Sequence, residues 1–303
     1  MAEGSVAPKA LSVVIASQNA RASVVACLAS LRAQDPNGLV EIVVVDNSRD
    51  GTARVIAEKF PDVRLIGVAG PRLIPELWGL GAKSVRGEVV AFTTAHCVPD
   101  ERWLAETRRL HQSEHAAIGG AIENDPSSSL AEWAVYFCRY AQYMLPFAPH
   151  LAEQVPADNA SYKLWALEKY VDPGSAEFWE FEVNRRLHRD GHSLLLTPQI
   201  LVKQERSFGV WDFCAQRLAH GRIFGAARVA AASKARRVLY LASSPLIPPV
   251  FLVKLARQVL GKGRHRREFL LSFPIVTLFV LCWSLGESLG YLFGTPVREG
   301  NLA

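Results

Sequence analysis

Alternating strand and helix patterns fill the first hundred residues, and they constrain the fold more than any other feature of the chain. Apolar runs rich in Val and Ile at 11–16, 39–45 and 63–68 predict strands, and segments with apolar residues at helical spacing separate them. Asn19 is the expected N-cap of the first helix. Strands that are joined through helices pair in parallel. The sequence therefore predicts a mostly parallel sheet covered by helices on both faces.

Polar residues follow the ends of three predicted strands. Ser17 and Asp46 end the first two, and residues 94–96 follow a strand expected at 88–93. Because ligands of such sheets bind beyond the carboxyl ends of the strands, we expect these residues to form the floor of a site. A carboxylate at Asp46 can accept hydrogen bonds from a nucleotide base or ribose. It can equally cap the turn that it opens, and spacing alone leaves both readings open.

Two segments carry a resemblance to a known family. The sequences LSVVIAS at 11–17 and EIVVVDNSRDGT at 41–52 resemble the nucleotide-sugar half of family 2 glycosyltransferases of the membrane-associated bacterial type. The resemblance implies the α/β glycosyltransferase A fold, a Rossmann-like mixed, mostly parallel sheet flanked by helices. It also implies a nucleotide-sugar donor, with Asp46 at a uracil ring and with Ser17 and Thr94 in the same site.

The metal-binding motif of that family is absent. Where members have Asp-x-Asp, this chain reads TAHC at 94–97. A divalent ion between two phosphates prefers hard oxygen ligands, and the resemblance implies Mn or Mg. Because the carboxylates are missing, the sequence does not decide whether this protein binds a metal. His96 can bind a metal through a neutral ring nitrogen, or it can be a strand-end residue hydrogen-bonded to backbone. A metal-independent transferase that neutralises the diphosphate with Arg222 and other basic side chains is a third reading.

A carboxylate further along the chain is the candidate general base. Arg186-Leu187 resembles the Arg-Leu that precedes a Gly in the family, and this match places Glu180 at the catalytic Asp. Glu182 lies four residues before Arg186, which predicts an ion pair on one helix face. Asn159 matches a family element beside the donor sugar, although a plain N-cap is the alternative. Only the Gln of the processive motif Gln-x-x-Arg-Trp is present, at Gln204, so polymer synthesis is disfavoured.

The C-terminal part differs in composition from the rest. Residues 221–303 contain 12 Lys and Arg against three Asp and Glu, whereas the whole chain carries a net charge of +5. The basic residues flank apolar runs and do not alternate with aromatic ones, which favours an anionic membrane surface over nucleic acid. A run at 238–253, interrupted by three prolines, predicts a re-entrant or interfacial pair of short helices.

A second apolar run, at 269–293, is long enough to span a bilayer. Gly286, Gly290 and Gly294 lie four residues apart, a pattern that permits close packing against a partner helix. Glu287 would be costly in lipid, so it must face a partner or the interface. The basic loop at 262–267 is expected to stay cytoplasmic.

These observations predict three parts. They are a tail at 1–9, a glycosyltransferase A-fold domain at 10–230, and a basic, apolar membrane-associated region at 231–303 that holds the hydrophobic membrane helices. Five scattered cysteines, an odd number without any C-x-x-C pair, indicate reduced thiols. We expect the catalytic domain on the cytoplasmic side of the inner membrane.

The expected function is an inverting, non-processive transfer of a sugar from a nucleotide-sugar, a UDP-sugar, to a lipid-linked or glycan acceptor of the cell envelope. The resemblance of the residues around Asp46 and Glu180 supports this expectation. The alternative is a degenerate glycosyltransferase fold that acts as a binding or scaffold subunit of a membrane complex. The missing Asp-x-Asp carboxylates favour that alternative, and donor turnover separates the two.

Overall fold

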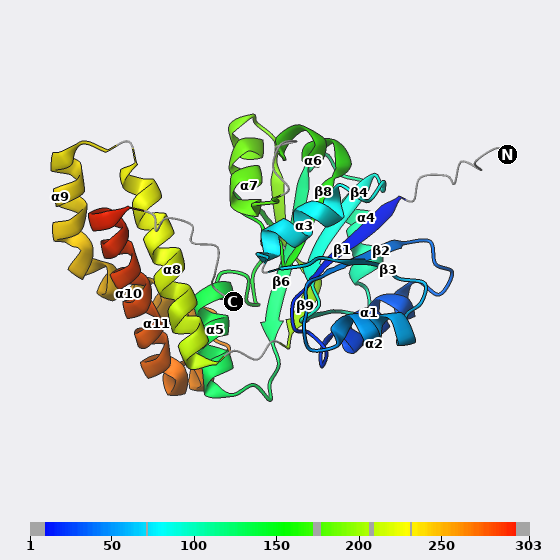
Figure 1. The fold of residues 1–303 in the computed structure, drawn as a ribbon, viewed down its shortest axis with the longest axis horizontal. Helices are drawn as coiled ribbons and strands as arrows, with labels where there is room; N and C mark the ends of the chain where they lie inside the picture. Colours follow the sequence, from blue (N-terminus) through cyan, green and yellow to red (C-terminus); the bar gives the residue numbers. More distant parts are fainter. Residues whose placement is uncertain (1–9, 71, 172–176, 206–208, 231, 295–303) are drawn as a thin grey trace. The chain divides into compact units, whose positions relative to one another are not determined.

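The structure, a computed structural model, describes residues 10–70, 72–171, 177–205, 209–230 and 232–294. The chain divides into two compact units, and Figure 1 shows the elements of each. The first unit comprises Met1–Glu123 and Leu145–Arg206, and the second comprises Asn124–Met144 and Ser207–Ala303. These two units are defined by how the backbone packs. The predicted end of the glycosyltransferase domain at residue 230 stays a prediction.

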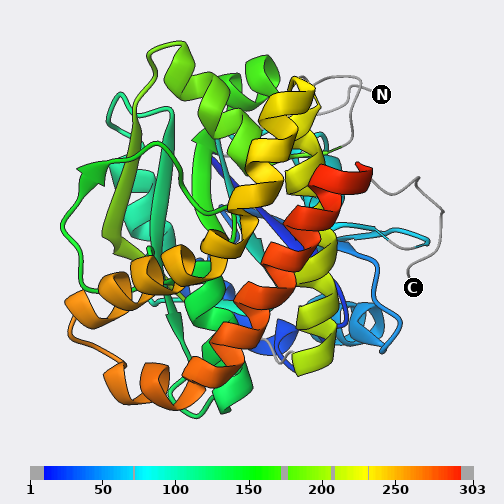
Figure 2. The same cartoon turned by 90° about the vertical axis from the view of Figure 1, so that its left-hand side faces the viewer.

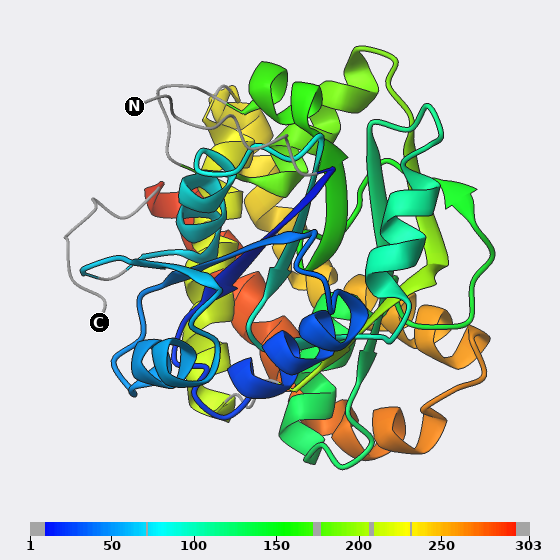
Figure 3. The same cartoon turned by 90° about the vertical axis from the view of Figure 1, so that its right-hand side faces the viewer.

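A mixed sheet forms the centre of the first unit (Figures 1 and 3). Its strand order is β3-β2-β1-β4-β8-β6-β9-β5, with β7 paired to β9. The first four strands of that order are parallel, whereas β8 runs antiparallel to β4 and β6. The strands are β1 (Leu11–Ser17), β2 (Glu41–Asp46), β3 (Arg64–Gly67), β4 (Val89–Thr94), β5 (Cys97–Pro99), β6 (Ala117–Asn124), β7 (His150–Leu151), β8 (Asn159–Lys163) and β9 (Leu194–Gln204). The predicted mixed, largely parallel fold class is confirmed.

Helices join these strands in the first unit. They are α1 (Val24–Gln34), α2 (Thr52–Lys59), α3 (Ile74–Ala82), α4 (Trp103–Leu110), α6 (Leu164–Tyr170) and α7 (Glu180–Arg189). The prediction that Asn19 caps the first helix is wrong, because α1 begins at Val24 with Ser23 at the N-cap position. Asn19 instead has a positive φ of 50°, a conformation that Asn tolerates better than most residues.

An aromatic cluster joins the sheet to α7. Phe178, which is fully buried, stacks on Phe92 of β4 with ring centroids 4.3 Å apart and an interplanar angle of 13°. Tyr162 of β8 and Trp78 of α3 contact the same Phe178 ring edge-on, at 5.3 and 6.4 Å. Phe178 also donates its backbone N–H to the Pro75 carbonyl at 2.8 Å. The start of α7 is therefore fixed against β4, β8 and α3.

The second unit is helical (Figure 2). It contains α5 (Leu130–Tyr140), α8 (Val210–Val229), α9 (Lys234–Ser243), a 3-10 turn (Ser244–Leu246), α10 (Ile247–Gly261) and α11 (Arg266–Phe293). The two short helices predicted around 238–253 are present as α9 and α10. They continue into each other through the 3-10 turn, because Pro245 and Pro248 occupy first-turn positions where no backbone N–H donor is needed.

Two helical stretches of this unit are long and apolar enough to cross a membrane. They are Lys234–Gly261, with mean hydropathy 1.6, and Arg266–Phe293, with mean hydropathy 2.1. The Lys234–Gly261 stretch is almost entirely uncovered, whereas α11 buries one face against its neighbours. Length and composition therefore allow membrane association of the second unit.

Glycines let α8 and α11 approach until their backbones touch. A Cβ atom built on Gly286 would overlap the Leu218 carbonyl oxygen, and one built on Gly221 would overlap that of Trp283. Gly290 and Gly225 make equivalent contacts with the opposite helix. The small-residue face that the sequence shows on α11 therefore has a partner within the chain. Gly294 lies outside this contact, with φ +74° at the end of the helix.

Glu287 also faces α8. Its Oε1 atom lies 2.8 Å from Arg228 Nη1, and its Oε2 atom accepts a hydrogen bond from Trp283 Nε1 at 3.2 Å. The Tyr291 hydroxyl donates to the same carboxylate. Because Glu287 is only 3% exposed, these partners compensate for the removal of its charge from solvent.

We predict that Gly286→Ala destabilises the packing of α8 on α11, because the added methyl group meets a backbone carbonyl that cannot rotate away. Overpacking of this kind costs about 1–3 kcal/mol. Thermal unfolding of the detergent-purified chain measures the effect. Gly261→Ala is the matched control, since nothing lies within 4 Å of a Cβ at that position. Equal melting temperatures for the two variants would contradict the contact.

Candidate active site

The predicted floor residues gather at one edge of the sheet. In the parallel register Ser17 pairs with Asp46, and Thr94 of β4 pairs with Ala16. Ser17 is fully buried, and Asp46 and Thr94 are 3% and 5% exposed. The parallel pairing places the ends of β1, β2 and β4 side by side, so these three side chains lie at the same edge of the sheet.

A hydroxyl connects Asp46 to the loop after β1. The Ser48 hydroxyl donates to Asp46 Oδ1 at 2.5 Å and accepts the backbone N–H of Asn19 at 2.7 Å. Asn19 Oδ1 in turn accepts the backbone N–H of Arg49 at 3.0 Å. The β1–α1 and β2–α2 loops are thus locked together, which gives the side chain of Asn19 a role other than capping.

Asp50 and Gly51 form the turn after β2. Gly51 has φ +88°, a conformation that favours glycine. Asp50 accepts hydrogen bonds from the Thr52 hydroxyl at 2.5 Å and from the Arg21 backbone N–H at 3.1 Å. Burial opposes ionisation of Asp50, but these hydrogen bonds and that from the Thr52 backbone hold its pKa below the usual value.

Several polar atoms at this edge have no partner among the described residues. Ser17 Oγ and Asn47 Oδ1 are buried and make no hydrogen bond. Asp46 uses only Oδ1, in its bond with Ser48, which leaves Oδ2 unused within the described part of the chain. Buried polar atoms are costly when unpaired, so this group suits a polar ligand that supplies both donors and acceptors.

His96 holds the loop after β1 against the end of β4. Its Nε2 lies 3.2 Å from the Gln18 carbonyl oxygen, and its Nδ1 lies 3.0 Å from Ser23 Oγ. Because a carbonyl only accepts, Nε2 carries a hydrogen. Nδ1 is then the ring nitrogen left for a metal, and it faces the Ser23 hydroxyl, which lies within hydrogen-bond distance of both Nδ1 and the Ala20 carbonyl.

The donor set at this position does not fit a metal held by protein side chains. Thr94 and Ala95 offer no charge, and no group of three His, Cys, Asp or Glu residues within the described ranges could hold an ion. The nearby thiol is unsuitable too, because burial and the charge of Asp158 raise the pKa of Cys97 to about 12. All five cysteines are free, as the sequence indicates.

Both polar atoms of the Asn159 side chain are hydrogen-bonded within the fold. Its Oδ1 accepts from Trp103 Nε1 at 2.7 Å, and its Nδ2 donates to the carbonyls of Ala121 at 2.7 Å and Ile200 at 3.3 Å. It begins β8 and is completely buried, and α6 starts only at Leu164. The alternative of an N-cap is therefore wrong, and the second lone pair of Oδ1 is what remains for the sugar contact, which stays a prediction.

Glu180 is the first residue of α7 and is partly exposed. It lies two residues after Phe178, whose stacking on Phe92 fixes the start of the helix. Glu182, in contrast, binds Arg185 and Arg186 at 2.8 Å each, which confirms the predicted ion pair. The hydrogen bond from Arg185, followed by that from Arg186, lowers the pKa of Glu182 to about 2.

The structure groups the predicted site residues unequally. Ser17, Asp46, Thr94 and His96 lie together at the strand ends, and Asn159, which pairs with Thr93, lies at the same edge of the sheet. Glu180 lies on α7 of the same unit. Arg222 belongs to α8 of the second unit, where its Nε donates to the Gly294 carbonyl at 3.2 Å. Asn47 and Ser48 are not among the residues predicted for the site, although both lie inside the motif at 41–52.

Comparison with known proteins identifies the class. Residues 12–157 match the family model for Glycosyl transferase family 2. This match covers just under half of the chain, and together with the fold it indicates a glycosyltransferase with the glycosyltransferase A fold. No curated protein matches the chain significantly.

Solved structures agree with this fold. A mannosyltransferase, PcManGT from Pyrobaculum calidifontis in complex with GDP-Man and Mn2+, is 19% identical, with 95% of this chain and 90% of that chain covered and a TM-score of 0.57. TarS from S. aureus (residues 1–349), in complex with UDP-GlcNAc, is 14% identical, with 95% and 93% covered and a TM-score of 0.47. At these identities the first likeness establishes the fold, and the second adds no argument.

We predict that His96→Ala loosens the β1–α1 loop without changing the response to metal. The variant should melt several degrees lower and bind donor more weakly, while the ratio of turnover with manganese to turnover with chelator stays that of the parent chain. Turnover measured across a manganese series, with a chelator as the zero point, tests this. His150→Ala, at an exposed position, is the control. A large shift in the manganese requirement of His96→Ala would instead make His96 a metal ligand.

Proposed function

We propose that this protein is an inverting, non-processive glycosyltransferase that moves one sugar from a UDP-sugar to a lipid-linked or glycan acceptor at the cytoplasmic face of a membrane. The observation that supports this most is the group of unpartnered polar atoms beside Asp46. Ser17 Oγ, Asn47 Oδ1 and Asp46 Oδ2 surround the ends of β1 and β2, the position where open α/β sheets bind nucleotides.

The chemistry of this group suits a uracil base. The Asp46 carboxylate can accept the ring N–H, and the Ser17 hydroxyl can donate to a ring carbonyl. Ser48 and the Asn19 loop hold the carboxylate in place through Oδ1 and leave Oδ2 for the base. A guanine also presents N–H donors to a carboxylate, so a test of this assignment must compare uridine and guanosine donors.

Glu180 is the proposed general base. In an inverting transfer it takes the proton of the acceptor hydroxyl while that oxygen bonds to the sugar C1. The bond from C1 to the phosphate oxygen breaks on the opposite face, and its electron pair leaves with the nucleotide diphosphate. Glu182 cannot replace Glu180 in this role, because both Arg185 and Arg186 already bind its carboxylate.

Charge on the leaving diphosphate must be neutralised. A divalent ion would supply Lewis-acid stabilisation, but the residues at 94–97 do not offer it a ligand set. We therefore favour basic side chains for this role. Arg222 is the candidate from the sequence alone, since it belongs to the second unit and the proposed donor residues belong to the first. The Nη atoms of Arg222 have no partner within the described part of the chain, since only Nε is bonded.

Membrane association of the enzyme is supported by two features of the second unit. Lys234–Gly261 and Arg266–Phe293 are long and apolar enough to span a bilayer. Basic residues lie at the starts of both stretches and in the loop between them. All of them can face an anionic cytoplasmic surface if the first stretch is re-entrant or interfacial, as the sequence predicts, and only the second stretch crosses the bilayer. A lipid-linked acceptor would be presented at that surface.

We predict that Asp46→Asn weakens donor binding by at least about tenfold, since a hydrogen bond to a charged acceptor contributes about 1.5–3 kcal/mol. Calorimetric titration with UDP, UDP-sugars and GDP-mannose measures the affinities. Asp62→Asn, at an exposed ion pair, should bind like the parent chain. Unchanged affinity of Asp46→Asn would refute the contact between Asp46 and the nucleotide base. Tighter binding of GDP-mannose than of UDP-sugars would show that the donor carries guanosine and not uridine. Binding of none of the donors would favour the scaffold alternative.

We predict that Glu180→Gln lowers turnover by about 10²–10⁴-fold with little change in donor affinity, because a general base contributes about that factor. Glu182→Gln, two residues away on the same helix, should keep turnover within about threefold. Steady-state assays with a lipid-phosphate and a glycan acceptor, together with donor titrations, give both quantities. Full turnover by Glu180→Gln would remove it from catalysis.

A further inference from the structure

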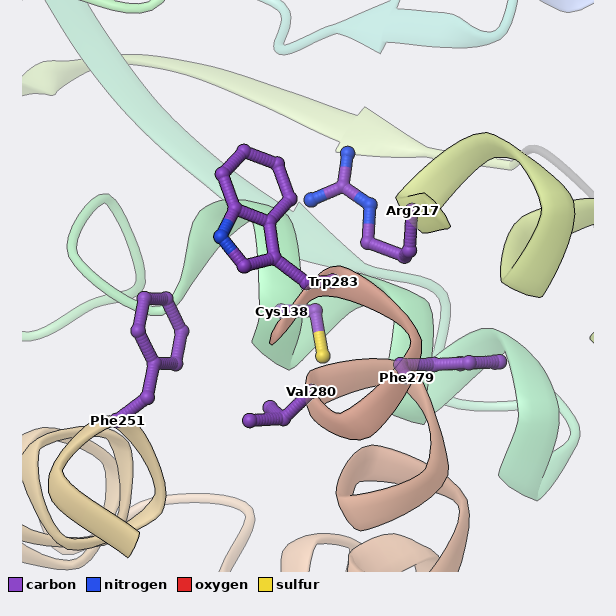
Figure 4. A pocket seen from close by; sticks show the side chains of 6 residues that line it. All are labelled: Cys138, Arg217, Phe251, Phe279, Val280 and Trp283. Atoms are coloured by element: carbon purple, nitrogen blue, oxygen red, sulfur yellow. The ribbon is translucent and has the colours of Figure 1, made fainter. Parts of the chain in front are cut away.

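The second unit contains a cavity of about 70 Å³ between its helices (Figure 4). The lining residues come from α5, α8, α10 and α11, and they are Cys138, Arg217, Phe251, Phe279, Val280 and Trp283. All but one of these side chains are apolar or weakly polar. The cavity therefore combines an apolar wall with a single strong cation.

Arg217 supplies that cation. Figure 4 shows its guanidinium beside the indole of Trp283, and the guanidinium carbon lies 5.1 Å from that ring and 4.8 Å from the ring of Phe213. Its Nε atom is buried and has no hydrogen-bond partner. Its Nη2 atom makes only a long contact of 3.4 Å with His220 Nδ1. No carboxylate in the described ranges pairs with Arg217.

Arg217 keeps its charge at this position. Burial, followed by the nearby charge of Arg139, lowers the pKa of Arg217 to about 10, so Arg217 remains charged at neutral pH. A cation that is removed from water is stable only when an anion or hydrogen-bond acceptors compensate it. Aromatic faces supply only part of this compensation.

We propose that this cavity binds the phosphate headgroup of an anionic lipid, with Arg217 bound to the phosphate and the acyl chain along the apolar wall. A guanidinium can form two parallel hydrogen bonds to phosphate, and the unpaired Nε is one of the donors required. Free phosphate would find only one strong donor group here. A lipid gains in addition from contact with Phe251, Val280 and Phe279, and Phe251 is 42% exposed on α10, which opens the wall to a bilayer.

This site is independent of the proposed sugar transfer. All its residues belong to the second unit, and none of them is among the proposed donor or base residues. Loss of lipid binding would therefore leave the assignments of Asp46 and Glu180 untouched, and loss of transferase activity would not remove the lipid site.

Native mass spectrometry of the full chain in detergent, with about 0.3 M salt to screen surface charges, tests the proposal. The probes are dioleoyl phosphatidic acid, dioleoyl phosphatidylcholine and inorganic phosphate. We expect phosphatidic acid to bind at least about tenfold more tightly than either of the other two, and Arg217→Ala to lose at least about tenfold of that affinity. Arg236→Ala, an exposed arginine of α9 in the same unit, should bind within about twofold of the parent chain.

A second variant tests the cavity without removing the charge. Val280→Phe fills the apolar wall, so it should also weaken phosphatidic acid binding at least about tenfold, and it serves as the test if Arg217→Ala does not fold. Equal affinity of both variants and the parent chain would overturn the site. Inorganic phosphate that binds as tightly as phosphatidic acid would overturn the lipid assignment, as would equal binding of phosphatidylcholine.

Discussion

The stacking of Phe178 on Phe92 is the contact on which the arrangement of the catalytic unit depends. Phe92 belongs to β4, whose end leads into residues 94–97, and Phe178 comes immediately before the helix that begins with Glu180. This ring pair therefore fixes the proposed base, Glu180, relative to the strand ends that carry the proposed donor residues. Tyr162 and Trp78 close around the same ring, so the position of α7 is fixed by packing as well as by its connection to the chain.

The sequence predicted the parallel strands and their polar ends because both depend on local patterns. A short apolar strand that ends in Asp46 is expected inside an α/β sheet with Asp46 at its carboxyl end. The parallel register then brings Ser17 beside Asp46. The ion pair of Glu182 with Arg186 was predictable for the same reason, since helical geometry alone places these residues together.

The roles of Asn19, His96 and Asn159 depend instead on partners far away in the sequence. Asn19 bonds to a loop about thirty residues later, and Asn159 bonds to carbonyls of β6 and β9. No local pattern shows which strands will surround a residue, so a buried structural amide and a sugar-binding amide look alike in the sequence. His96 is similar, because its two ring nitrogens face a backbone carbonyl and a hydroxyl that precede it by more than seventy residues.

The path of the chain has a practical consequence for producing the first unit without the apolar helices of the second. The second unit takes α5 from the middle of the sequence, and Phe137 of α5 packs edge-on against Phe269 of α11 at 5.1 Å. A truncation after residue 230 would keep α5 and α8 but remove α11, the helix that covers both of them. Such a fragment would expose two apolar helix faces and tend to aggregate. A soluble fragment of the first unit alone calls for two cuts, one that replaces the segment between Glu123 and Leu145 with a short linker and one that ends the chain before α8.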